Sequence, residues 1–195
     1  ATPTDRDGNG MGPWVQALEC ALPTSQLIAQ GYLCHVKVYA PDRKKHNGKV
    51  VKRGLAGDIV ESWKQYAENR PTVVFFSRVQ HSMDAVKSFQ AAGISAVHMD
   101  ANTPDMPDEN GYSERDRILD SVASGKVKVL CNVGIVGEGV DVPELGCCQI
   151  ACEMGSRIRF LQALGRIMRI LVGKKYGILI DHSGAVFRHG FPDED

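Results

Sequence analysis

Arg166 and Arg169 stand three residues apart, just after Gly165, and both are residue types that bind phosphate. A guanidinium keeps its charge and presents a planar fork of N–H donors, which suits the negative charge on a phosphoryl group during transfer. Residues 156–170 have a helical pattern, and side chains three apart on a helix point the same way. We therefore expect the two guanidiniums to converge. An ordinary amphipathic helix with two solvated arginines is the alternative.

A glycine-rich stretch, residues 132–143, directly follows an apolar, strand-like run. Gly134, Gly137 and Gly139 permit positive φ and allow the backbone to approach a ligand closely. Free amides at the start of a following helix would hold phosphate, and Asp141 could accept a hydrogen bond from a ribose hydroxyl. A plain glycine-rich turn is the alternative for this stretch.

The elements that must position these residues alternate between strand and helix. Short apolar runs rich in β-branched residues predict buried strands, and the longer amphipathic segments between them predict helices. We expect strands at 34–39, 72–77, 95–99, 127–131, 147–151 and 176–181, and helices at 14–22, 25–30, 58–69, 82–92, 113–124 and 156–170. This order favours an α/β fold, a parallel β-sheet with helices on both faces in three layers.

Ligands of such sheets bind where the strands end. Polar residues follow several of the expected strands: Ser77 and Arg78, Asp100, the stretch 132–141, and Asp181 with His182. We interpret lone histidines here as structural, because no nucleophile accompanies them.

Composition narrows the class of protein. The 195 residues carry 23 basic and 23 acidic side chains, so the net charge predicts no partner. The six cysteines form no Cys-x-x-Cys pair, which favours reduced cysteines in a cytoplasmic protein over a metal site or disulfides. No apolar run approaches the roughly 18 residues of a membrane span.

Residues 162–169, Gln-Ala-Leu-Gly-Arg-Ile-Met-Arg, resemble motif VI of superfamily 2 helicases, Gln-x-x-Gly-Arg-x-x-Arg. In that family both arginines reach the γ-phosphate of ATP. The resemblance implies that Arg166 and Arg169 are catalytic and that Gln162 binds ATP. Many relatives place arginine directly after the glutamine, where this chain has Ala163, so one contact of the family is in doubt.

The glycine-rich stretch resembles helicase motif V, including its Glu-Gly-x-Asp-x-Pro core. The resemblance implies that Gly139 and Asp141 bind ATP, while Asn132 and Gly134 contact a nucleic-acid phosphate.

Residues 72–78 resemble motif IV, in which the strand tip faces the nucleic-acid backbone. This implies a nucleic-acid contact for Ser77 and Arg78. A core strand followed by a capping serine and a solvated arginine is the alternative.

Together these motifs resemble the C-terminal, second RecA-like domain of a superfamily 2 DEAD/DEAH-type helicase of phage or bacterial type. The resemblance implies that residues 1–56 are the tail of a first motor domain with its linker, and that 57–195 are the helicase C-terminal domain. The start of the chain looks truncated.

No Gly-x-x-x-x-Gly-Lys-Ser/Thr phosphate loop occurs in the sequence. We therefore expect ATP and Mg²⁺ to be bound mainly by the first RecA-like domain of the parent chain, and this fragment to be inactive alone. Nucleic acid is the expected partner, DNA rather than RNA, with no membrane. A non-hydrolysing nucleic-acid-binding module and a metabolic α/β enzyme for a phosphorylated small molecule are the competing hypotheses.

Overall fold

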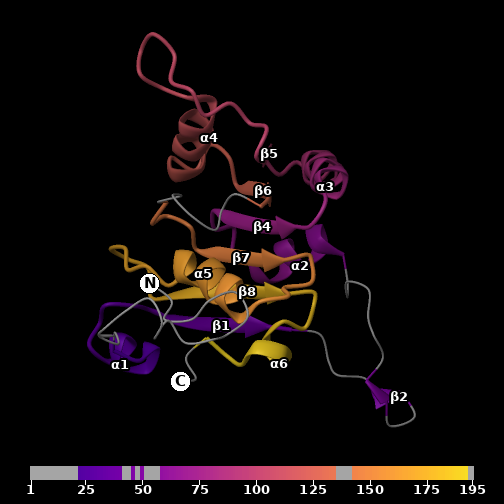
Figure 1. Ribbon diagram of the computed structural model, residues 1–195, viewed down its shortest axis with the longest axis vertical. Coiled ribbons are helices and arrows are strands. Elements are labelled where there is room, and N and C mark those ends of the chain that lie inside the picture. Colours follow the sequence, from indigo (N-terminus) through magenta and orange to yellow (C-terminus); the bar gives the residue numbers. More distant parts are fainter. Residues whose placement is uncertain (1–21, 41–44, 47–48, 51–57, 135–141, 193–195) are drawn as a thin grey trace, which may run out of the picture.

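The computed structural model describes residues 22–40, 45–46, 49–50, 58–134 and 142–192 (Figure 1). Six parallel strands form the main sheet in the order β1-β8-β7-β4-β6-β5. They are β1 (His35–Tyr39), β4 (Thr72–Phe76), β5 (Ala96–Met99), β6 (Val129–Val133), β7 (Cys147–Ile150) and β8 (Tyr176–Asp181). Two short strands, β2 (Lys45–His46) and β3 (Lys49–Val50), pair in a separate antiparallel sheet.

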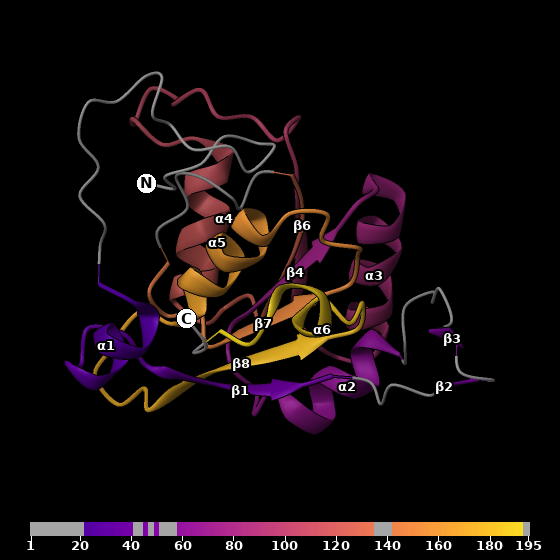
Figure 2. The same cartoon turned by 60° about the horizontal axis from the view of Figure 1, so that its bottom comes forward.

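Helices cover both faces of the main sheet (Figure 2). They are α1 (Thr24–Ala29), α2 (Ile59–Tyr66), α3 (Val79–Ala91), α4 (Glu114–Ala123), α5 (Arg157–Ile167) and α6 (Val186–His189). The hydrophobic core is split by the sheet into two clusters, one beneath α2 and α3 and one beneath α4 and α5. The three-layer α/β fold expected from the sequence is confirmed.

The central strands are buried on both faces, which explains their unbroken apolar sequence. All five residues of β4 are buried, and alternate side chains such as Val73 and Val74 belong to opposite core clusters. Cysteines serve as small apolar residues in the same layers. Burial raises the pKa of both the Cys131 and the Cys147 thiol to about 12, so neither is a reactive thiolate at neutral pH.

Side-chain caps mark the starts of two helices, α2 and α4. Asp58 caps α2 by accepting hydrogen bonds from two backbone amides of its first turn. Ser113 and Asp116 form a capping box at the start of α4. The prediction for α3 was wrong at its start: the helix begins at Val79, and Ser82 is a buried residue inside it. The Ser82 hydroxyl lies 2.7 Å from His98 Nδ1, so it joins α3 to β5 instead of capping a helix.

The boundary expected at residue 56 cuts through the main sheet. Strand β1, assigned from the sequence to a connecting arm, pairs along its whole length with β8. The expected helix at 14–22 and the assignment of the first residues to another motor domain lie outside the described residues. None of the described helices is long and apolar enough to cross a membrane.

Candidate functional site

The candidate residues lie at two opposite edges of the sheet. Helix α5 starts after the carboxyl end of β7 and leads to the amino end of β8, so its last turn lies at the amino edge. Arg166 is in that last turn. Ser77 and Gly134 follow the carboxyl ends of β4 and β6, at the other edge. The sheet therefore separates a candidate phosphate site from the strand tips.

Arg169 is not on the helix. Helix α5 ends at Ile167, and Arg169 forms an isolated antiparallel bridge with Leu33, next to the start of β1. The amide of Cys34 donates to the carbonyl of Met168 over 2.9 Å, which takes the backbone after α5 out of the helix. The expected helix to residue 170 was wrong for this reason. Helical spacing therefore does not align Arg166 with Arg169.

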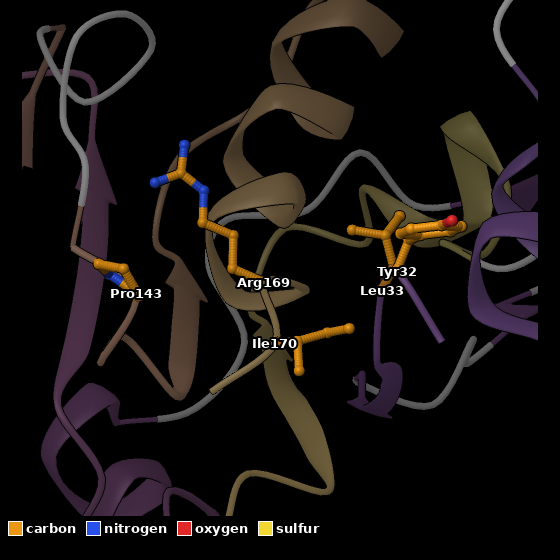
Figure 3. Close-up of a pocket in the computed structure, with 5 residues that line it drawn as sticks. All are labelled: Tyr32, Leu33, Pro143, Arg169 and Ile170. Carbon is orange, nitrogen blue, oxygen red and sulfur yellow. The ribbon is translucent and has the colours of Figure 1, made fainter. Parts of the chain in front are cut away.

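An open hollow of about 370 Å³ lies beside Arg169, lined also by Tyr32, Leu33, Pro143 and Ile170 (Figure 3). Figure 3 shows the Arg169 guanidinium extending toward the Pro143 side, away from Tyr32. Pro143 is two residues beyond Asp141 in sequence. The tertiary structure thus brings the end of the glycine-rich stretch and the second arginine to one place.

Lys174 ties these two segments together. Its amine donates to the carbonyl oxygen of Leu145 over 2.6 Å and lies 3.4 Å from that of Pro143. Burial lowers the pKa of Lys174, and the neighbouring charges of Arg70 and Arg169 lower it further. Three cations near one edge make a positive environment that suits a polyanionic ligand.

The other residues predicted to bind ATP divide into two groups. Gln162 lies four residues before Arg166 on α5, so both are on one side of the helix, and both are partly exposed. Gly139 and Asp141 lie outside the described residues.

At the carboxyl edge the predicted nucleic-acid residues differ in exposure. Phe76 pairs with Val133, so Ser77 and Gly134 follow at one level on neighbouring strands. Ser77, Arg78 and Gly134 are exposed, and Gly134 has a φ of 82°, which favours glycine. Asn132 is only 1% exposed. The groups at these tips that a phosphate can reach are therefore Ser77, Arg78 and the Gly134 backbone.

Other polar residues at the strand ends hold the fold together. Asp100 accepts hydrogen bonds from the amides of Asn102 and Thr103 in the loop after β5. Asp181 accepts from the amides of Ser183 and Val186 and so fixes the start of α6.

Two residues at the amino edge lie outside motifs IV, V and VI. Tyr32 lines the hollow, and the Lys174 amine lies beside it at the carbonyl oxygens of Pro143 and Leu145; neither was selected from the sequence as a site residue. For Tyr32 the one available signal is an aromatic residue in a loop just before a strand. The residues that the structure describes hold no cluster of three histidine, cysteine or acidic side chains able to bind a metal ion.

The sequence matches the family model described as the helicase conserved C-terminal domain over residues 55–171, which is more than half of the chain. The chain belongs to this helicase C-terminal domain family. The matched residues contain α2 to α5, the glycine-rich stretch and both arginines, so the two edges described above are parts of a helicase C-terminal domain.

Relatives of this helicase domain are longer proteins. The chain is 36% identical over 139 residues to a 51.5 kDa protein of a Lactococcus phage, covering 71% of the chain and 29% of the relative. It is 30% identical over 132 residues to irc3 of Schizosaccharomyces pombe, described as a mitochondrial ATP-dependent helicase, covering 67% of the chain and 21% of the relative. The chain thus spans less than a third of either.

Solved structures agree with the RecA-like fold. A fragment described as an HsdR subunit of a type I restriction enzyme from Vibrio vulnificus has a TM-score of 0.70 and 17% identity, covering 99% of this chain and 40% of that one. The DNA-bound, ATP-dependent Type ISP restriction-modification enzyme LlaBIII has a TM-score of 0.53 and 18% identity, covering 83% and 13%. At these identities the likeness concerns the fold.

Proposed function

We propose that this chain is the second motor domain of an ATP-dependent nucleic-acid helicase or translocase. The observation that carries the proposal is the hollow at the amino edge, where Pro143, just beyond Asp141, lies across from Arg169. Two segments that resemble separate helicase motifs meet there, although 18 residues, from 144 to 161, lie between the two motifs in sequence.

In the proposed mechanism, Arg166 and Arg169 complete an ATP site whose other half belongs to the first motor domain. Their guanidiniums neutralise charge that develops on the γ-phosphoryl group during transfer, and such an arginine is worth about 10³–10⁵ in turnover in related systems. Gln162, Gly139 and Asp141 contact the nucleotide. Because the arginines act only when the two domains close, hydrolysis is coupled to domain motion.

The phosphate loop and the Mg²⁺ ligands come from the first RecA-like domain of the parent protein. Mg²⁺ supplies charge neutralisation of the phosphates when it is bound there. This chain contributes the cationic face of the cleft, and alone it hydrolyses no ATP.

Nucleic acid lies across the carboxyl edge, held through its phosphates by Ser77, Arg78 and Gly134. Asn132 was also predicted to contact nucleic acid, but it is only 1% exposed, so we assign it no phosphate contact. We propose DNA as the substrate, supported by the phage relative. We also propose a cytoplasmic location, supported by the free cysteines among the described residues.

The test is the ATPase activity of the parent protein with single-stranded DNA, duplex DNA or RNA added. Replacing Arg166 or Arg169 by alanine lowers kcat by about 10³-fold or more. Arg117→Ala is the matched control, since Arg117 is an exposed arginine of α4 that is paired with Asp108 in the preceding loop. Unchanged activity in both arginine variants contradicts the assigned roles. If the parent protein binds DNA but has no ATPase activity, the alternative of a non-hydrolysing nucleic-acid-binding module is favoured.

A further inference from the structure

We propose that Tyr32 provides the surface on which the base of the bound nucleotide stacks. The inference rests on the proposed function, because it takes the hollow beside Arg169 as one half of an ATP site. It adds a base-binding residue from outside motifs IV, V and VI.

The hollow has the composition of a nucleobase site. Leu33, Pro143 and Ile170 give it apolar walls, and Arg169 is the one charged residue among those that line it. Its volume of about 370 Å³ falls within the usual range for small-molecule sites. A flat, largely apolar ring attached to a polyanion matches this combination of walls and charge.

Tyr32 is available for stacking. Its side chain is 66% exposed, which leaves the ring uncovered by this domain. Every nucleobase has a π-face, and an aromatic side chain stacks on it with little dependence on the base. An exposed tyrosine beside a phosphate-binding arginine is therefore placed to hold the other end of a nucleotide.

Backbone hydrogen bonds fix Tyr32 relative to Arg169. The Tyr32 amide donates to the carbonyl of Leu27 over 2.8 Å, and Leu33 bridges to Arg169 itself. On the next residue, the Cys34 amide donates to Met168. The main-chain positions that carry the ring and the guanidinium are thus fixed before ligand binds, which lowers the entropic cost of binding.

The two side chains are directed to different parts of a ligand. Figure 3 shows the Arg169 guanidinium extending away from Tyr32, toward Pro143. In the proposed complex the base lies at the ring and the phosphates lie at the guanidinium. The hollow is open to solvent, which leaves room for the first motor domain to cover the other face of the base.

The experiment compares two ligands in the full-length parent protein: ATP, and inorganic tripolyphosphate as a competitive inhibitor that has no base. Tyr32→Ala raises KM for ATP about tenfold, since stacking of one base is worth about 1–3 kcal/mol by alanine substitution. The inhibition constant of tripolyphosphate stays unchanged. Tyr32→Phe restores the wild-type KM, and Tyr32→Leu, which keeps apolar bulk without an aromatic face, behaves like the alanine variant.

Tyr112→Ala is the control, because Tyr112 is also exposed, at 51%, and lies in the loop before α4. The proposal is overturned if Tyr32→Ala leaves KM for ATP unchanged, or if it weakens ATP and tripolyphosphate equally, which indicates structural support alone. Failure of the proposed function has a separate signature: Arg169→Ala then leaves turnover intact, whatever Tyr32 does.

Discussion

Lys174 donates a hydrogen bond to the carbonyl oxygen of Leu145 over 2.6 Å, and this contact joins the segment after the glycine-rich stretch to the loop that follows α5. The loop carries Arg169, so the amine connects the two sides of the candidate nucleotide site. A buried carbonyl such as that of Leu145 requires a donor, and Lys174 supplies it at the cost of its own desolvation.

Replacing Lys174 by methionine leaves the Leu145 carbonyl without this donor. We expect the domain to lose about 1–3 kcal/mol of unfolding free energy, the usual cost of an unsatisfied buried polar group. Urea denaturation of the two variants measures it. Lys175→Met is the matched control, since the neighbouring lysine is exposed, and equal midpoints for the two variants would contradict the assigned contact.

Gly165→Ala separates stability from function. Gly165 lies inside α5, and an added Cβ meets no described atom within 4 Å. Glycine costs a helix interior about 0.5–1 kcal/mol relative to alanine, so the substitution stabilises the isolated domain. We expect it to lower the ATPase activity of the parent protein. No described atom fills the space beside Gly165, so that space is available to the nucleotide or to the first motor domain when the two domains close. Thermal unfolding and steady-state turnover measure the two effects.

Gly177→Ala is expected to destabilise the domain, whereas Gly165→Ala is expected to stabilise it. A Cβ at Gly177 would lie 2.6 Å from the carbonyl oxygen of Ile167, a backbone atom at the end of α5. We expect a loss of about 1–3 kcal/mol from overpacking. A Gly177→Ala domain as stable as Gly165→Ala would show that β8 and α5 are not in close contact.

Arg78→Ala tests the carboxyl edge. An exposed arginine that contacts a phosphate releases about one counterion on binding, so its loss reduces the slope of log K against log salt by about 1. Fluorescence anisotropy with the parent protein and labelled DNA at several salt concentrations measures that slope. Arg117→Ala serves as the control on α4, and the same slope for wild type and Arg78→Ala rules out the contact.

Glu68 makes the free energy of unfolding depend on pH in the acidic range. The hydroxyl of Tyr176 donates to both carboxylate oxygens of Glu68, and this bond, followed by the charges of Arg70 and Lys37, lowers the pKa of Glu68 below 4.5. The unfolded chain then binds the proton more readily than the folded one, so stability is present above pH 4.5 and is lost as the pH falls below it.

Glu68→Gln removes this linkage and flattens the loss of stability on acidification. Denaturant midpoints measured from pH 7 to pH 3 record the difference from wild type. Glu61→Gln is the control, because Glu61 is an exposed residue of α2 paired with Lys64. Parallel curves for wild type and Glu68→Gln would exclude the linkage.

The strands were predictable because each is a short apolar run, and burial on both faces of a parallel sheet requires that composition. The predicted run 72–77 became β4, and 176–181 became β8 without change. Helix ends were less predictable. Helix α3 starts at Val79, and Ser82 lies inside it with its hydroxyl beside His98; a serine's preference for caps gives no sign of such a partner.

The sequence by itself determined the α/β fold and the residue types of the site, because periodicity and guanidinium chemistry are local properties. Only the tertiary structure decided which residues meet. Arg169 leaves α5 because the chain beside β1 pairs with it, and Cys34 and Ile167, which are 133 residues apart, come into contact at that point. Tyr32 joins the hollow by the same pairing. Such contacts depend on how the sheet is ordered, which the spacing of residues along the chain does not encode.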